Sequence, residues 1–282
     1  MTADQSSDYF ITHDRLRLAY RYLRKDHAQG TLLILHGHGE HYGRYLKFEK
    51  ELENIPLSIA LFDQRGQGRS EGREVYCDSF RDFTGDVTSF VQYLKAKYEI
   101  PDPIYLLGHS LGALVAVFWA MEHPENVRSM VLSSPCLGLR LPQWIQTLND
   151  CLNQWLPKFC YHNPVYPPHL THHPEEVKKY RQDPFIKRKI TVRMLHEMLS
   201  YMAQLDAMTT ISWPFPVHIL MAGSEKIVDA SKTKQFFEKL RVPDKEIFVF
   251  EGFYHEIFNE WEQEKAFEEI RRVLTSGIKN TR

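Results

Sequence analysis

A serine between two glycines is the residue of this chain best suited to nucleophilic chemistry. Ser110 lies at the centre of the sequence GHSLG, residues 108–112, which follows an apolar run at 104–107 and precedes an Ala-rich apolar stretch. A strand before this G-x-S-x-G pattern and a helix after it would place the serine on a tight turn with its hydroxyl exposed. The glycines would let neighbouring backbone pass close by, and the helix N-terminus would offer free N–H groups to an oxyanion. We expect Ser110 to be the nucleophile.

A histidine close to the C-terminus can supply the base that such a serine needs. His255 lies a few residues after the apolar run 246–250, which has the composition of a last strand. An imidazole on the loop after that strand can take the serine proton and later return it to the leaving group. We therefore expect His255 to be the general base.

Two acidic residues compete for the role of orienting that histidine. Glu225 and Asp229 both follow the apolar run 215–221. The acid must hold the imidazole in one tautomer and stabilise the imidazolium. Glu225 is nearer the strand end, where a turn can aim its side chain at the base, whereas Asp229 adjoins a helix start and could simply cap it. We favour Glu225 and keep Asp229 as the alternative.

Three histidines after the strand expected at 31–35 allow two kinds of chemistry. The sequence HGHGEH, residues 36–41, is a glycine-rich loop that could fold over the nucleophile and supply one backbone N–H of an oxyanion hole. Its spacing also resembles the H-x-H-x-D-H zinc motif of metallo-β-lactamase-type hydrolases, with His36, His38 and His41 as ligands. A zinc site would leave the serine motif unexplained and has glutamate where aspartate belongs. We favour the loop and expect no metal.

These residues need a framework that brings them to one edge. Apolar runs typical of buried strands recur along the chain, and stretches typical of helices lie between them. The expected strands are 31–35, 57–62, 104–107, 127–133, 215–221 and 246–250, and the expected helices include 80–98, 230–240 and 261–274. This alternation predicts an α/β fold with a mostly parallel central sheet flanked by helices.

One segment breaks the alternation. From residue 135 to 213 the strand pattern stops for about eighty residues, where a crossover needs only a dozen or so. We expect this segment to be an inserted helical cap, or lid, on a core formed by residues 1–134 and 214–282. It contains two apolar stripes: Trp144, Leu148, Leu152, Trp155, Leu156 and Phe159, and then Ile190, Met194, Leu195, Met198, Met202 and Leu205. We expect both to be buried helix faces; the alternative is an adaptable apolar pocket, with part of the first helix resting on lipid.

Composition restricts the class of protein. The 282 residues are 43% hydrophobic and 13% aromatic, enough for a substantial core, and 35 basic against 36 acidic residues give a formal charge of −1. This balance gives no reason to expect nucleic acid or an anionic membrane as a partner. The N-terminus shows no secretory signal, no apolar run is long enough to span a membrane, and four irregularly spaced cysteines suit free thiols. We expect a cytoplasmic enzyme, at most peripheral to a membrane.

The motifs together resemble those of the monoacylglycerol lipase and lysophospholipase family of the α/β-hydrolases. The resemblance rests on five stretches in family order: LHGHGEHYGRY, FDQRGQGRSEG, LLGHSLGA, AGSEKIVD and FYHEIFNE. It implies an α/β-hydrolase fold and hydrolysis of monoacylglycerols or lysophospholipids through an acyl-serine intermediate. The implied substrate is a small lipid ester, and no cofactor is implied. The resemblance also implies an oxyanion hole formed by the N–H groups of His38 and Leu111.

The chain departs from the family pattern at two positions. Gln67 stands where the loop D-x-R-G-x-G-x-S usually has histidine, and Glu225 stands where the catalytic aspartate is usual. Glutamate serves in this role elsewhere in the superfamily. The resemblance therefore implies a triad of Ser110, Glu225 and His255.

Three other functions stay open on the sequence alone. The nearest is a carboxylesterase acting on other small or aromatic esters, because the packing of the cap sets the choice of ester. The second is a zinc-dependent hydrolase that uses the three histidines of residues 36–41. The third is a non-enzymatic binding module on a hydrolase fold.

Overall fold

The structure is a computed structural model that describes residues 8–163 and 165–279. Its main sheet contains β1 (Asp8–Ile11), β2 (Arg17–Leu23), β3 (Thr31–Leu35), β4 (Ser58–Phe62), β5 (Ile104–His109), β6 (Val127–Ser133), β10 (Val217–Ala222) and β12 (Lys245–Phe250). The strands lie in the order β1-β2-β4-β3-β5-β6-β10-β12. The two pairs that involve β2 are antiparallel, and the strands from β4 to β12 are parallel. The mostly parallel sheet predicted from the sequence is confirmed.

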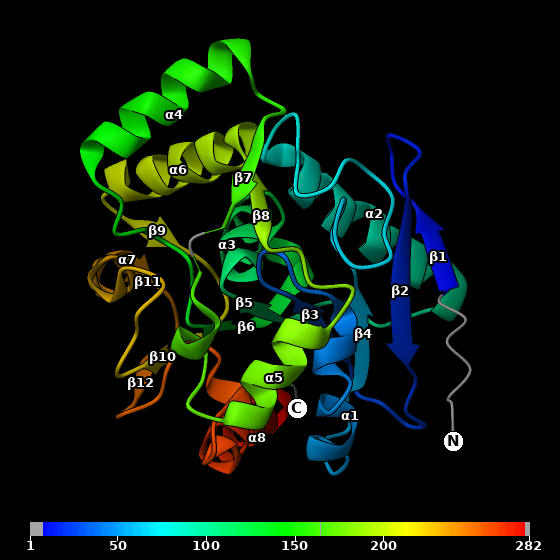
Figure 1. Cartoon of the computed structure of the whole chain (residues 1–282). Coiled ribbons are helices and arrows are strands. Elements are labelled where there is room, and N and C mark those ends of the chain that lie inside the picture. Colours follow the sequence, from blue (N-terminus) through cyan, green and yellow to red (C-terminus); the bar gives the residue numbers. More distant parts are fainter. Residues whose placement is uncertain (1–7, 164, 280–282) are drawn as a thin grey trace.

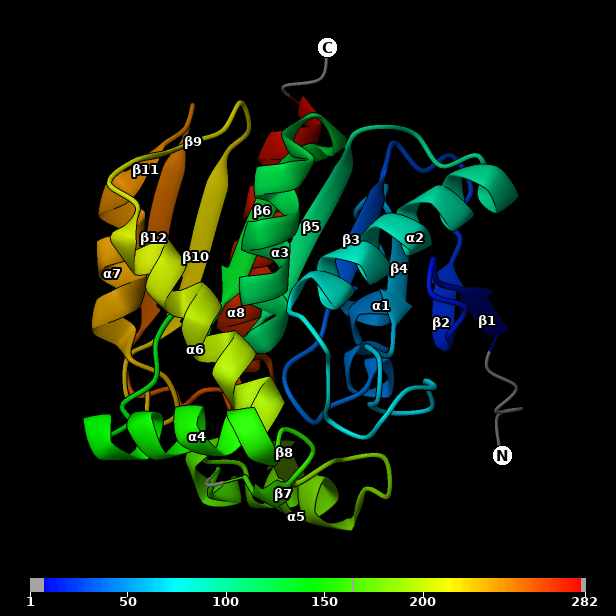
Figure 2. The ribbon, with the colours of Figure 1, turned by 90° about the horizontal axis from the view of Figure 1, so that it is seen from above.

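Helices cover both faces of this sheet (Figures 1 and 2). On one face, α2 (Arg81–Tyr98) and α3 (Leu111–Glu122) pack into a core that also takes Phe236 of α7 (Ala230–Lys239). On the other face lie α1 (Phe48–Glu51) and α8 (Gln263–Lys279). The central strands β3, β4 and β5 are buried along their whole length, which explains their continuous apolar runs.

Residues 135–213 form the segment between β6 and β10, and it lies across the carboxyl ends of the parallel strands (Figure 1). It contains α4 (Gln143–Trp155), β7 (Cys160–His162), α5 (Pro174–Gln182), β8 (Lys189–Thr191), α6 (Val192–Ala207) and β9 (Ile211–Ser212). Strands β7 and β8 pair with each other, and β9 pairs with β11 (Leu240–Arg241). The sequence did not predict these strands, because two or three residues are too few to show a period of two.

The two apolar stripes of this segment behave differently. The Met-rich stripe is the buried face of α6, as predicted. The prediction is wrong for α4, where Trp144, Leu148 and Trp155 are 67%, 50% and 83% exposed. Helix α4 buries Asn149 and Asn153 instead, and Asn149 donates a hydrogen bond to the Val192 carbonyl at the start of α6. The apolar stripe of α4 therefore faces outward.

No helix within the described ranges is both long and apolar enough to cross a bilayer.

Candidate active site

Ser110 occupies a strained turn between β5 and α3. Its backbone angles are φ 50° and ψ −115°, a conformation that a residue with a side chain adopts only when its surroundings hold it there. The Ser110 N–H donates to the Ser133 carbonyl (3.0 Å), and the Ser110 carbonyl accepts from the Cys136 N–H (3.1 Å). Strand β6 and the residues that follow it therefore fix the turn from one side.

The glycines on either side of this turn are required by close backbone approach. A Cβ atom on Gly112 would lie 2.1 Å from the Leu35 carbonyl oxygen, and one on Gly108 would lie 2.5 Å from the Cα of Ala113. Both distances are far below van der Waals contact. The reason inferred from the sequence, that the glycines of G-x-S-x-G let neighbouring backbone pass close by, thus applies at both positions.

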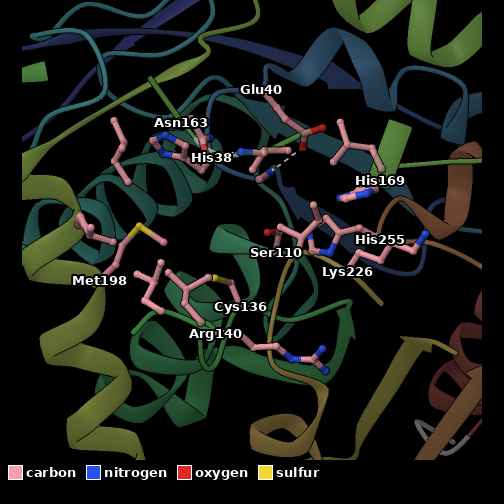
Figure 3. Close-up of a pocket in the computed structure, with 18 of the residues that line it drawn as sticks. His38, Glu40, Ser110, Cys136, Arg140, Asn163, His169, Met198, Lys226 and His255 are labelled. Carbon is pink, nitrogen blue, oxygen red and sulfur yellow. Dashed lines mark hydrogen bonds between the residues drawn. The ribbon is translucent and has the colours of Figure 1, made fainter. Parts of the chain in front are cut away.

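Glu225 and His255 are brought together from separate loops. Glu225 follows β10 and His255 follows β12, and His255 Nδ1 lies 2.8 Å from Glu225 Oε2. The other carboxylate oxygen of Glu225 accepts from the backbone N–H groups of Ile227 (2.7 Å) and Val228 (3.3 Å). Because Nδ1 donates to the carboxylate, Nε2 of the neutral imidazole keeps its lone pair. Figure 3 shows Ser110 and His255 next to each other at the same pocket.

Burial and charge act in opposite directions on this pair. Burial alone would lower the pKa of His255, but the charge and hydrogen bond of Glu225 outweigh it and raise this pKa above the ordinary value. Burial would raise the pKa of Glu225, but His255 and the two backbone N–H groups lower it below its ordinary value. Glu225 is therefore an anion that stabilises a positive charge on His255.

Asp229 has a different task. It is the N-cap of α7, and its Oδ1 accepts from the backbone N–H of Ser231 (3.0 Å) and from the Ser231 hydroxyl (2.7 Å). The structure thus brings Glu225 to His255 and places the alternative acid at a helix end.

Residues 36–41, here called the HG loop, lie beside the nucleophile turn. The Gly37 N–H donates to Glu40 Oε2 (2.8 Å), and the Gly39 N–H donates to Gln67 Oε1 (2.6 Å). Among residues 8–163 and 165–279, the His38 N–H has no such partner. Leu111 is the first residue of α3, so the helix provides no acceptor for its N–H. These two N–H groups are the candidate oxyanion donors.

The three histidines of the HG loop do not form a metal site. His36 Nε2 accepts from the Gln64 N–H (2.9 Å), His38 Nε2 lies 2.9 Å from the Lys189 carbonyl, and His41 Nε2 lies 2.8 Å from Asp183 Oδ2. Each ring is thus committed to a different partner. In the described part of the chain, no three His, Cys, Asp or Glu side chains are arranged to hold a metal ion.

Four residues that support the site were not predicted as functional. Arg44 contacts both Glu40 and Glu256, which links the HG loop to the residue after His255. Burial would raise the pKa of Glu40, but Arg44 and other neighbours hold it far below its ordinary value, so Glu40 is charged. Gln67 binds the HG loop through the Gly39 N–H. Its departure from the family pattern was the one signal in the sequence that could have identified Gln67 as a functional residue.

A pocket of about 470 Å³ opens above Ser110 and His255. Its walls come from the core and from residues 135–213, and they are largely apolar. Arg140, Asn163, His169 and Lys226 provide polar groups (Figure 3). The apolar wall includes Leu141, Ile145, Leu170, Ile190, Leu195 and Met198. A pocket of this size and lining suits a small amphiphilic molecule.

Comparison with known proteins supports the same interpretation. A sequence profile described as serine aminopeptidase, S33 matches residues 26–262. The monoglyceride lipase of Mus musculus is 31% identical over 91% of this chain and 85% of its own length. A phospholipase of Bacillus subtilis is 27% identical over 90% of this chain and 98% of its own length. The crystal structure of Paleococcus ferrophilus monoacylglycerol lipase is 28% identical, with a TM-score of 0.83 over 92% of this chain and 99% of that one.

The profile spans most of the chain, and the structural similarity extends over nearly all of it. The predicted α/β-hydrolase fold and the resemblance to monoacylglycerol lipases are therefore confirmed. The chain belongs to the serine aminopeptidase S33 family of α/β-hydrolases and is a carboxylic ester hydrolase.

Proposed function

We propose that the protein hydrolyses monoacylglycerols or lysophospholipids, with Ser110 as nucleophile, His255 as general base and Glu225 as the acid that orients it. One observation carries this proposal: a hydrogen bond of 2.8 Å from Glu225 orients His255, whose ring lines the same pocket as the strained Ser110 turn. An imidazole oriented in this way keeps Nε2 free to accept the serine proton.

The reaction proceeds in two halves. Ser110 Oγ attacks the ester carbonyl while its proton passes to His255 Nε2. The N–H groups of His38 and Leu111 stabilise the tetrahedral oxyanion. His255 then protonates the leaving alcohol, and the acyl group stays on the serine. A water molecule, deprotonated by His255, attacks the acyl-serine; His255 then returns this proton to Ser110 Oγ as the acyl–oxygen bond breaks and the acid is released. This mechanism needs no metal or organic cofactor.

The substrate class follows from the pocket and from the relatives. The apolar wall suits an acyl chain, and Arg140, Asn163, His169 and Lys226 offer polar groups to a headgroup. Two of the similar proteins are named for monoacylglycerol hydrolysis and one for phospholipid hydrolysis. If turnover is confined to short or aromatic esters and both lipid classes are inert, the carboxylesterase alternative is correct.

Labelling with a fluorophosphonate tests the catalytic assignment. Wild type is expected to label, and Ser110→Ala is expected to lose both labelling and several orders of magnitude in turnover, because no other group supplies the nucleophile. Cys136→Ala is the control for labelling through a thiol, since Cys136 is a free cysteine that lines the same pocket. Burial raises the pKa of this thiol to about 12, so the variant is expected to label like wild type. Substantial turnover by Ser110→Ala would exclude the proposed mechanism.

We also propose that residues 135–213 act as a cap whose outer helix contacts a lipid surface. Helix α4 supplies Ile145 to the pocket wall and turns Trp144 and Trp155 outward. The protein carries almost no net charge, so burial of apolar area would have to drive the contact. A neutral phosphatidylcholine bilayer fits these properties, and it would also hold the lipid ester.

Vesicle sedimentation tests this contact. The double variant Trp144→Asp, Trp155→Asp is expected to lose binding to phosphatidylcholine vesicles. Trp261→Asp is the matched control, because Trp261 is 63% exposed but lies just before α8 and stacks on His173 at the start of α5 rather than belonging to α4. Equal binding by wild type and the double variant would show that α4 does not contact lipid.

A further inference from the structure

The HG loop is held from outside by a short piece of the cap, residues 183–189. Three polar contacts join them. His41 Nε2 lies 2.8 Å from Asp183 Oδ2, and the Lys187 N–H donates to the Gly39 carbonyl over 2.8 Å. The third contact joins His38 Nε2 to the Lys189 carbonyl over 2.9 Å. The loop that carries one candidate oxyanion donor is therefore attached to the cap at the donor residue itself and at two positions that follow it.

The close approach of this segment also explains a glycine. Gly39 has φ +73°, in the left-handed region, and a Cβ at this position would lie 2.2 Å from the Lys187 carbonyl oxygen. No side chain fits between the HG loop and residues 183–189. The two pieces of chain are thus packed backbone against backbone, and a shift of one is transmitted to the other.

The His41–Asp183 hydrogen bond has a defined direction. His41 Nδ1 accepts from the Gly43 N–H (3.2 Å), as the N-cap of the short helix η1 (Tyr42–Tyr45). The proton of the neutral ring is therefore on Nε2, which donates to Asp183. Asp183 Oδ1 accepts from the Phe185 N–H (2.8 Å), so the carboxylate is oriented by its own turn. Both side chains are largely buried, so little water competes for the contact.

We propose that Asp183 is a positioning residue that acts through His41 to hold the HG loop, and with it the His38 N–H, in the geometry required for oxyanion stabilisation. This inference rests on the proposed function, because it assigns the residue a part in the same reaction. An oxyanion donor contributes only when it lies at hydrogen-bond distance from the developing charge. A loosened loop therefore lowers kcat more than it raises KM, since the substrate also binds along the apolar wall of the pocket.

The chain offers substitutions that isolate this contact. Asp183→Ser keeps a hydroxyl that can accept from the Phe185 N–H but is too short to reach His41. Asp183→Asn keeps only one oxygen, so it can accept from the Phe185 N–H or from His41 Nε2 but not from both, and its NH2 group then faces the other donor. On the other side, His41→Asn retains a favourable N-cap for η1 and cannot reach Asp183. Asp150→Ser is the matched control, because Asp150 Oδ1 also lies 2.8 Å from a histidine, His196, between two cap helices away from the HG loop.

Steady-state kinetics with p-nitrophenyl butyrate, together with thermal unfolding, test the inference on the full chain. Asp183→Ser and His41→Asn are each expected to lower kcat about tenfold, part of the hundred- to thousandfold that a whole oxyanion donor contributes, with KM changed less than twofold. The double variant is expected to lose no more than either single variant, because both remove the same contact. Asp150→Ser is expected to stay within threefold of wild type, and Asp183→Asn is expected to lose no more kcat than Asp183→Ser.

Wild-type kcat in Asp183→Ser, or a double variant whose loss is the product of the two single losses, would overturn the proposal. An equal loss of kcat in Asp150→Ser would overturn it as well, since the effect would then be general damage to the cap. If Asp183→Ser does not fold, His41→Asn decides the matter: it must lose kcat with KM changed less than twofold, and wild-type kcat in this variant would overturn the proposal. Failure of the proposed function is recognised separately, because wild type would then be inactive or Ser110→Ala would be active.

Discussion

Arg44 and Glu256 form a two-point ion pair in the interior: Nη1 lies 2.7 Å from Oε1, and Nη2 lies 2.7 Å from Oε2. Arg44 belongs to η1, directly after the HG loop, and Glu256 follows His255. Arg44 Nη1 also contacts Glu40, which in turn accepts from the Tyr45 hydroxyl (2.7 Å). One guanidinium thus joins the loop of the candidate oxyanion donor to the loop of the candidate base.

Replacing this arginine is expected to destabilise the fold. Arg44→Ala would leave Glu40 and Glu256 charged, buried and without their shared cation. Loss of one partner from a buried pair typically costs about 3–5 kcal/mol in the free energy of unfolding. Arg272→Ala is the control, since Arg272 forms its ion pairs with Glu246 and Glu269 at the surface and should cost about 1 kcal/mol or less. Urea unfolding measures both, and equal effects of the two substitutions would contradict the structural role of Arg44.

The pH dependence of turnover should reveal the Glu225–His255 coupling. His255 must be neutral to accept the serine proton, so activity falls as the pH drops below its pKa in the free enzyme. Since Glu225 raises that pKa, the acid limb of kcat/KM in wild type should lie above the ordinary histidine value of 6.5. Glu225→Gln removes the negative charge and should move this limb to lower pH, while kcat falls about 10³- to 10⁴-fold through loss of the oriented tautomer. An unshifted acid limb in the variant would show that Glu225 does not set the charge state of His255.

The alternative acid can be tested by the same assay with the opposite expectation. Asp229→Asn keeps an oxygen that can cap α7 and removes only the charge, so turnover should stay within about twofold of wild type. Asp229→Ala should lower the free energy of unfolding by about 1 kcal/mol, the usual cost of a lost N-cap, again with little effect on kcat. A hundredfold fall in kcat for Asp229→Asn would instead assign the orienting role to this residue.

The parts of the site that the sequence predicted are those that local chain geometry dictates. Gly108 and Gly112 could be interpreted because a strand, a tight turn and a helix are consecutive in sequence. The choice of Glu225 over Asp229 also followed from position, since one lies at a strand end and the other at a helix start. Arg44, Glu40 and Glu256 escaped notice because their pairing depends on how two loops far apart in sequence meet over the sheet.

The error at α4 has a similar cause. A one-sided apolar stripe shows that a helix has two unlike faces, but it does not reveal which face meets the protein. Asn149 and Asn153 carry no apolar signal, yet both are buried. Asn149 is held there by hydrogen bonds with the Val192 carbonyl and the Tyr161 hydroxyl. The Met-rich face of α6 belongs to the hydrophobic core that α2 and α3 also join, so there the ordinary interpretation was correct.

Gln67 offers a test of how the core side holds the HG loop. Its Oε1 accepts the Gly39 N–H at 2.6 Å, and Gln67→Ala would leave this buried donor without its acceptor, a loss of about 1–3 kcal/mol in the free energy of unfolding. Because Gly39 is adjacent to His38, we also expect kcat to fall about tenfold, within the range set by partial loss of an oxyanion donor.

Gln67→His should restore most of this activity, since a neutral imidazole nitrogen can accept the same hydrogen bond. Gln146→Ala is the control, because Gln146 Nε2 donates to the Leu141 carbonyl (3.0 Å) within the segment between β6 and β10, and among the described residues no hydrogen bond joins Gln146 to the HG loop. Kinetics with one ester and thermal unfolding of the four proteins complete the comparison. If Gln67→Ala loses stability but keeps its kcat, the contact serves the fold, and the outer attachment through Asp183 is sufficient to position the loop.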